Sequence, residues 1–170
     1  MAQREHEKNV IQKKHKKSPA KFLHDLGVLG PNCIAVHLIH VNSQDKEILL
    51  KTKTHLVICP GSQILFETVS PLLEHLGDLK NISIATDCAA SNDSCHLLAE
   101  LGLTASLYKQ KTGEYICPKK LLNMVTINPA KALGVDSQIG SIEVSKQADL
   151  VFVKKTPHLL PEERLSLIHI

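Results

Sequence analysis

The sequence predicts an α/β fold built on a parallel sheet, of either the barrel or the doubly wound kind. Three apolar runs rich in branched residues, 33–41, 55–59 and 81–86, alternate with helical segments, which is the pattern of βαβ units. The runs are nearly continuous in apolar residues, as expected for strands covered on both faces. A (β/α)₈ barrel needs eight strands and about 250 residues, so these 170 residues predict only part of a barrel.

Turn and cap residues frame the helical segments. Residues 4–16 predict a polar helix, and Ser18 and Pro19 begin a second helix that Gly27 ends, since Ser caps helix starts and Gly follows helix ends. Pro60 and Gly61 are expected to stop the second strand. Further helices are predicted over 43–53, 70–77, 94–109, 119–125 and 129–133.

The C-terminal part of the sequence differs in character from the rest. Residues 140–154 predict two short strands around a turn at Ser145 and Lys146. We therefore divide the chain into a portion of a barrel at 1–135 and a small β element with a tail at 136–170.

Composition narrows the class of protein. With 43% hydrophobic and 22% charged residues, the chain can bury a core. It has neither a run as apolar as a membrane span nor a signal-peptide pattern, so we expect a soluble, cytoplasmic protein with no membrane partner. Five cysteines without a CxxC pair argue against a disulfide framework and a thiolate zinc site. Five aromatic residues and no Trp argue against a base-stacking nucleic-acid surface.

Positive charge is concentrated at the N-terminus. Residues 1–21 hold seven Lys or Arg against two Glu, which leaves this segment at +5. Such a segment is either the solvated face of a surface helix or a patch for nucleic acid or an anionic membrane. We take the solvated face as the working interpretation.

Polar residues near the strand ends are the candidates for chemistry, because ligands of parallel α/β sheets bind there. His37 interrupts an apolar run and is either a hydrogen-bonded core residue or part of a site. Asp87 follows the third run and could bind a metal, accept a proton or cap a turn. Ser62 follows the second run. His40 and His96 are expected to be ordinary loop or helix residues rather than metal ligands.

Five segments in order carry a resemblance to a known family. They are LGVLGPNCIAVHLIHV (26–41), VICPGSQ (57–63), IATDCAASND (84–93), TINPAKALGV (126–135) and IGSIEVSKQADLVFV (139–153). Together they resemble the amidohydrolase superfamily, within it the group of methylthioadenosine/S-adenosylhomocysteine deaminases and triazine chlorohydrolases. The resemblance implies a metal-dependent (β/α)₈ TIM barrel, of which this chain holds about strands 6–8, and a C-terminal piece of a small β-sandwich.

The resemblance also implies site residues. Asp87 matches the family's metal ligand after the eighth strand, which also moves a proton, and His37 matches a sixth-strand histidine that stabilises developing charge. Ser62 matches the loop after the seventh strand and is expected to bind substrate, whereas Ile58 and Gln63 depart from the family pattern there. Ser91 and Asn92 lie behind the metal ligand and are expected to contact or shape the substrate site. The implied cofactor is a divalent metal, zinc or iron, that activates a water molecule.

The sequence departs from the family most at its N-terminus. Gln3 falls where the family has a catalytic Glu, and the HxH metal ligands have no counterpart in the chain. We therefore expect a fragment of a hydrolase of non-peptide C–N bonds in a purine-like or triazine-like small molecule, inactive alone and binding metal weakly or not at all. The alternative is a non-catalytic remnant or assembly module of the same fold. The implied partners are a separate N-terminal half or a second copy of the chain.

Overall fold

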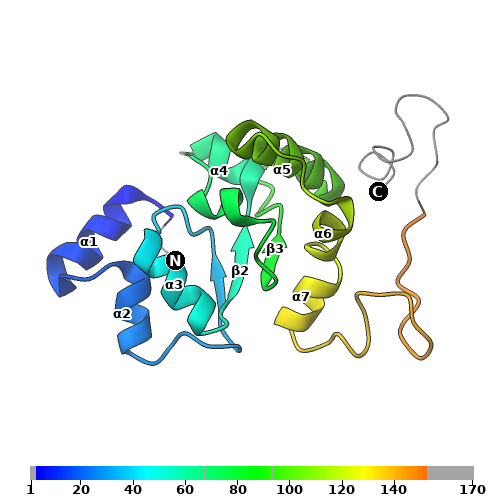
Figure 1. The fold of residues 1–170 in the computed structure, drawn as a ribbon, viewed down its shortest axis with the longest axis horizontal. Coiled ribbons are helices and arrows are strands. Elements are labelled where there is room, and N and C mark those ends of the chain that lie inside the picture. The colour runs from blue at the N-terminus through cyan, green and yellow to red at the C-terminus, as the bar shows by residue number, and fades with distance from the viewer. Residues whose placement is uncertain (1–2, 67, 93, 153–170) are drawn as a thin grey trace.

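A three-stranded parallel sheet forms the centre of the protein. The computed structural model describes residues 3–66, 68–92 and 94–152. Strands β1 (Ile34–Val36), β2 (His55–Ile58) and β3 (Ile82–Ile84) lie side by side in chain order, as Figure 1 shows. The register aligns Val36 with Val57 and Ser83 with Val57. The predicted parallel α/β sheet is confirmed, and its chain order is that of consecutive barrel strands.

Helices connect the strands and cover one face of the sheet. Their bounds are α1 Glu5–His15, α2 Pro19–Asp25, α3 Ser43–Lys51, α4 Pro60–Phe66, the 3₁₀ helix η1 Pro71–His75, α5 Leu97–Thr112, α6 Pro118–Asn123 and α7 Ile127–Ala132. Helix α2 starts as predicted, with the Ser18 hydroxyl accepting a bond from the Lys21 N–H and Pro19 in the first turn. In the described part of the chain, no helix is long and apolar enough to cross a membrane.

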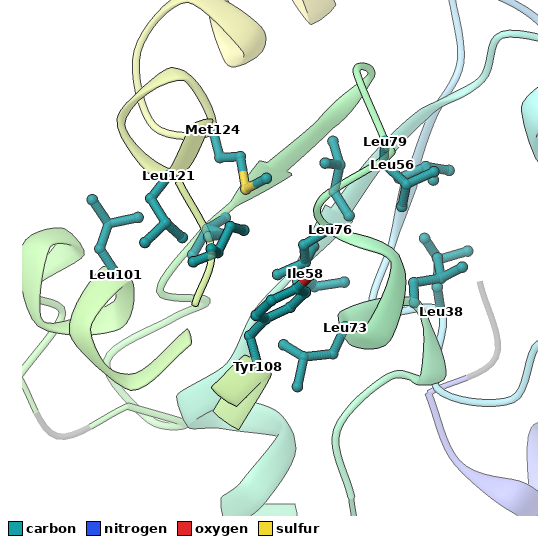
Figure 2. Close-up of a cluster of buried hydrophobic side chains, with 14 of the residues drawn as sticks. Leu38, Leu56, Ile58, Leu73, Leu76, Leu79, Leu101, Tyr108, Leu121 and Met124 are labelled. Carbon is teal, nitrogen blue, oxygen red and sulfur yellow. The ribbon is translucent and has the colours of Figure 1, made fainter. Parts of the chain in front are cut away.

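The hydrophobic core lies between this covered face and the helices. Alternation along a strand sends successive side chains to opposite faces, and Leu56, Ile58 and Ile82 are fully buried on the helical side. They pack with Leu73 and Leu76 near η1 and with residues of α5 and α6 (Figure 2). Each such aliphatic side chain stabilises the fold by roughly 1.5 to 3 kcal/mol when buried.

The opposite face of the sheet is only partly covered. Ile34 is 39% exposed there, and Val36 and Val57 are half-buried. On the same face the buried side chains of His55 and Ser83 form a hydrogen bond of 2.8 Å. The prediction that the strands are covered on both faces is therefore wrong for this face within the described residues.

Strand β1 is shorter than the apolar run that predicts it. The run spans 33–41, but the strand ends at Val36 because His37 and Leu38 take positive φ angles of 70° and 55°. The His37 N–H still donates to the Val57 carbonyl over 2.9 Å. The chain therefore leaves the sheet after the His37 N–H, at the turn formed by His37 and Leu38. This turn sets the direction of the His37 side chain.

Pro60 begins a helix instead of only ending a strand. The Gln63 N–H donates to the Cys59 carbonyl over 2.9 Å, so Cys59 stands in the cap position and Pro60 is the first residue of α4. Proline suits this position because the first helical N–H has no partner within the helix. The sequence analysis missed α4.

The two strands predicted over 140–154 do not form in the part that the structure describes. Residues 140–152 contain no strand, and Ile142, Val144 and Phe152 are 89, 97 and 91% exposed. A strand needs a neighbouring strand for its backbone hydrogen bonds, and no strand of the described residues lies beside this segment. The turn is present, with Ser145 at a φ of 74° and the Lys146 N–H bonded to the Glu143 carbonyl. Residues 153 and 154 lie outside the described residues, and the division at 135/136 stays a prediction.

Candidate active site

Asp87 and Ser62 meet beyond the carboxyl ends of β2 and β3. The Ser62 hydroxyl, fully buried in the first turn of α4, donates to Asp87 Oδ2 over 2.7 Å. The Cys88 N–H donates to Asp87 Oδ1 over 2.9 Å. The bond from Ser62 is the main cause that lowers the pKa of Asp87 below its ordinary value, because both bonds favour the charged form. The structure thus fixes an ionised carboxylate at this edge.

His37 directly follows the last residue of β1, at the same carboxyl edge of the sheet. Its Nδ1 is buried and has no hydrogen-bond partner among the described residues. Burial lowers the pKa of His37, and the negative charge of Asp87 partly opposes that shift. The unpaired Nδ1 of this imidazole can still donate or accept one hydrogen bond, depending on the tautomer.

Gln63 holds the turn that aims His37. This side chain is fully buried, and its amide nitrogen donates to the His37 carbonyl over 2.7 Å while its oxygen accepts from the Ser70 N–H over 2.9 Å. The Ser70 hydroxyl also donates to the Leu38 carbonyl over 2.7 Å. These bonds stabilise two non-glycine residues in the left-handed region, which is otherwise unfavourable. The sequence analysis noted Gln63 only as a departure from the family pattern.

Glu100 ties the loop after β3 to the start of α4. This buried carboxylate accepts from the Gly61 N–H over 3.0 Å and from Asn92 Nδ2 over 2.6 Å. The Asn92 side-chain oxygen accepts from two further backbone N–H groups, those of Ser94 and Cys95. Both ends of the Asn92 side chain are thus engaged within the fold, and the expectation that Asn92 contacts or shapes the substrate site stays a prediction. Sequence reasoning missed Glu100, and its position inside an amphipathic helix gave no signal.

The other candidates have ordinary roles or stand close to the site. Ser91 is buried, donates to the Cys88 carbonyl over 3.1 Å and helps to lower the pKa of Asp87. His96 caps α5, with Nδ1 accepting from the Ala99 N–H over 3.2 Å. His40 lies in the turn after β1. The structure therefore brings His37, Ser62, Asp87 and Ser91 to one edge of the sheet.

The residues at this edge fit one corner of a metal site. Within the described ranges, no three side chains of His, Cys, Asp or Glu come together as a complete metal site. Asp87 keeps carboxylate lone pairs beyond those used by Ser62 and Cys88, and the buried Nδ1 of His37 is unpaired within the described residues. An ionised carboxylate is a common ligand of divalent cations, so Asp87 can supply one ligand.

Residues 2–167 match the Amidohydrolase family. The chain belongs to this family. Among curated amidohydrolases, it is 38% identical over 156 residues to a 5-methylthioadenosine/S-adenosylhomocysteine deaminase of Thermoanaerobacter pseudethanolicus, an alignment that covers 89% of this chain and 36% of that relative. It is 30% identical over 140 residues to an S-triazine hydrolase of Gordonia rubripertincta, with 81% of this chain and 29% of that relative covered. The chain thus spans about a third of the length of these relatives.

Solved amidohydrolase structures share the fold. An adenosine deaminase from Xanthomonas campestris with bound zinc superposes with a TM-score of 0.87 at 27% sequence identity, over 98% of this chain and 40% of that protein. The resemblance seen in the sequence is confirmed, and the sheet is a piece of the family's barrel. The β-sandwich segment stays a prediction.

Proposed function

We propose that this amidohydrolase chain forms the Asp87 side of the active site of a hydrolytic deaminase that acts on an aminopurine ring. The observation that carries the proposal is the carboxylate of Asp87, which Ser62 fixes at the carboxyl edge of the sheet. At the same edge, the Nδ1 of His37 has no hydrogen-bond partner among the described residues. The likeness to a methylthioadenosine/S-adenosylhomocysteine deaminase and to an adenosine deaminase supports the substrate class.

The chemistry is the exchange of an amino group for water. Water adds to the ring carbon that carries the amino group, the C–N bond breaks, and ammonia leaves. Asp87 accepts the proton of the attacking water on a carboxylate lone pair that Ser62 and Cys88 do not use. His37 donates or accepts a hydrogen bond where charge develops on the water or the ring, which is electrostatic stabilisation by a preorganised group.

A divalent cation completes this proposal. Asp87 would be one of its ligands, and the others would come from residues outside the described set or from a partner polypeptide. The cation, zinc or iron, lowers the pKa of water to about 7 when bound, and the zinc of the similar adenosine deaminase supports its presence. Because one carboxylate and one imidazole hold zinc weakly, we expect the chain alone to bind it weakly.

The test supplies the missing ligands in a second polypeptide. The chain is co-expressed with the part of the 38% identical deaminase that precedes the matched region, and ammonia release is measured from methylthioadenosine, guanine and a triazine, with zinc or iron present. We expect release from methylthioadenosine by the pair only. If the two polypeptides form a stable complex that releases no ammonia, the result would instead support a non-catalytic assembly module.

Matched variants separate the site from the scaffold. Asp87→Asn and His37→Asn should each lower the rate at least about a hundredfold, in the range of losing a general base or a charge-stabilising donor. Asp78→Asn changes an exposed carboxylate just before β3 and should leave the rate unchanged. Equal rates for Asp87→Asn and the wild type would refute the assignment.

A further inference from the structure

The basic N-terminal segment lines a cavity that the proposed active site does not use. The cavity has a volume of about 490 Å³ and lies among the end of α1, the start of α2 and the start of α3. Its lining consists of Gln12, Lys16, Lys17, Ser18, Lys21, Asn42 and Gln44. Every one of these side chains is polar, three are lysines and none is acidic.

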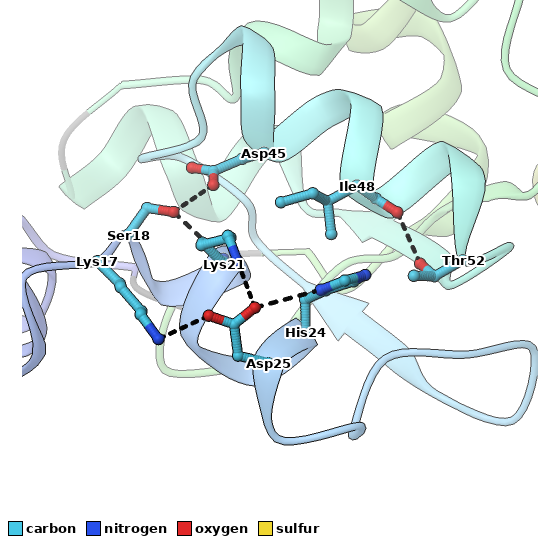
Figure 3. A network of polar contacts seen from close by, with 8 residues as sticks. All are labelled: Lys17, Ser18, Lys21, His24, Asp25, Asp45, Ile48 and Thr52. Atoms are coloured by element: carbon cyan, nitrogen blue, oxygen red, sulfur yellow. Dashed lines mark hydrogen bonds and ion pairs between the residues drawn. The ribbon is translucent and has the colours of Figure 1, made fainter.

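The carboxylate of Asp25 holds two of the lining lysines in place. Lys17 Nζ lies 2.7 Å from Asp25 Oδ2, and Lys21 bonds the other oxygen of the same carboxylate (Figure 3). These lysines hold the pKa of Asp25 well below its usual range. One carboxylate therefore orders two ammonium groups at the cavity.

Ser18 and Asn42 are fixed in a similar way. The Ser18 hydroxyl donates to the buried Asp45, and Asn42 exchanges bonds with Asp45 through its N–H, over 3.3 Å, and its side-chain oxygen, over 2.8 Å. The side-chain amide of Asn42 keeps its N–H₂ group as a donor. Even with Asp25 and Asp45 counted, the three lysines leave the surroundings positively charged.

The chemistry of the lining selects the class of ligand. Ammonium and amide N–H groups donate hydrogen bonds, and phosphate oxygens are strong acceptors for them. A volume of about 490 Å³ is within the range of small-molecule sites and exceeds what a single phosphate needs. The lining has no aromatic or aliphatic side chain, so it offers nothing on which a base could stack.

We propose that this cavity binds the diphosphate group of a small phosphorylated compound. The absence of aromatic side chains in the lining favours such a ligand over a nucleic-acid strand, whose bases stack on aromatic side chains. The site is distinct from the proposed deaminase site, because its lining shares no residue with the group formed by His37, Ser62, Asp87 and Ser91.

Titration of the 170-residue chain with inorganic pyrophosphate at low salt tests this site, followed by calorimetry and by amide NMR shifts. We expect saturable binding with a Kd of about 1 mM or tighter, with shifts at Lys16–Lys21 and at Asn42–Gln44. ADP should bind at the same residues with a similar Kd, which shows that the diphosphate is recognised whether free or attached to a nucleoside. Inorganic phosphate should bind more weakly.

Charge-matched variants decide the outcome. Lys16→Gln and Lys21→Gln should each weaken pyrophosphate binding about tenfold, as expected for loss of one charge-assisted hydrogen bond. Lys131→Gln removes the same charge from an exposed residue of α7 and should leave the Kd unchanged. Lys16 is exposed at the end of α1, so its variant keeps the test valid if Lys21→Gln fails to fold.

Three results would overturn the proposal. One is the absence of saturable binding, and another is an equal loss of affinity in Lys16→Gln and Lys131→Gln. The third is binding of a DNA duplex that is tighter than that of pyrophosphate and is weakened by Lys13→Gln. Lys13 lies on α1 outside the cavity lining, so this variant reports on binding outside the cavity. That result would assign the basic segment to nucleic acid.

Discussion

Gly61 occupies a position where a side chain has no room. A β-carbon added there would lie 2.4 Å from Glu100 Oε1 and 2.9 Å from Asn92 Nδ2. The Glu100 carboxylate is buried and bonded to both residues, so it cannot move aside without losing those bonds. We expect Gly61→Ala to lower the free energy of unfolding by about 1 to 3 kcal/mol, measured by urea denaturation.

Gly102 provides the matched control for this substitution. It lies inside α5 with no atom within 4 Å of its added β-carbon. Gly102→Ala should therefore keep or raise the stability, by up to about 1 kcal/mol, because alanine favours a helix. Equal stability of Gly61→Ala and the wild type would mean that the Glu100 network does not secure the start of α4.

Gln63 allows a second prediction at the residue scale. Gln63→Glu keeps the acceptor for the Ser70 N–H but replaces the donor to the His37 carbonyl with a carboxylate oxygen. At pH 7 we expect a loss of about 2 kcal/mol, since a buried donor bond is lost and a buried charge faces a carbonyl. The exposed Gln110→Glu on α5 is the control and should change stability little.

The pH dependence of Gln63→Glu follows from the same geometry. Burial raises the folded-state pKa of the new carboxyl above its unfolded value of about 4.3, so the native state binds the proton more tightly. Stability relative to the wild type should therefore be highest below about pH 4 and fall as the pH rises through the folded pKa. A deficit that does not change with pH would show that the new carboxyl is solvated.

At the scale of elements, the sequence predicts the strands better than it predicts how they end. The run 55–59 matches β2, His55–Ile58, within one residue, because its apolar pattern and Pro60 act locally. The run 33–41 overstates β1, because the bonds that bend the chain at His37 and Leu38 come from Gln63 and Ser70. Contacts between residues about thirty positions apart leave no local pattern in the sequence. The role of Glu100 could not be predicted for the same reason, because its contact with Gly61 is also distant in sequence.

The burial of His55 in β2 predicts a pH effect on folding. Burial lowers the pKa of His55, so the unfolded chain binds a proton more readily than the folded one. Stability is then fully present above the unfolded pKa of about 6.5 and is lost as the pH falls from there toward the folded value. The loss should be about 1 kcal/mol for each unit of pKa shift.

Substitution of His55 isolates this contribution. His55→Gln keeps an amide that can bond the Ser83 hydroxyl but cannot titrate, so unfolding free energies measured from pH 8 to pH 5 should vary less than in the wild type. His6→Gln, on the exposed surface of α1, should keep the wild-type slope. A slope in His55→Gln as steep as in the wild type would assign the pH effect to other groups.

At the scale of the whole molecule, the family's order of segments predicted the family and the candidate site residues, of which the family is confirmed. Apolar patterning misjudged which surfaces are covered. The runs 33–41 and 55–59 predict strands buried on both faces, yet Ile34, Val36 and Val57 are partly exposed on one face. Apolar patterning tells which side chains prefer burial but not whether this chain itself supplies the cover. The same reasoning applies to 140–152, where strand-like residues have no neighbouring strand in the part of the chain that the structure describes.

These exposed apolar residues predict association of the purified chain. Ile142 and Val144 alternate along the segment and are 89 and 97% exposed, and apolar surface of this kind drives contacts between molecules. We expect the weight-average mass in sedimentation to rise with concentration. The double variant Ile142→Thr with Val144→Thr keeps β-branched side chains but lowers their apolarity, so it should reduce the rise.

The control is Leu133→Thr, which changes a 67% exposed residue after α7 and should not reduce the rise in mass. A wild-type chain that stays monomeric, or equal effects of the variants, would show that residues 142–144 do not drive association.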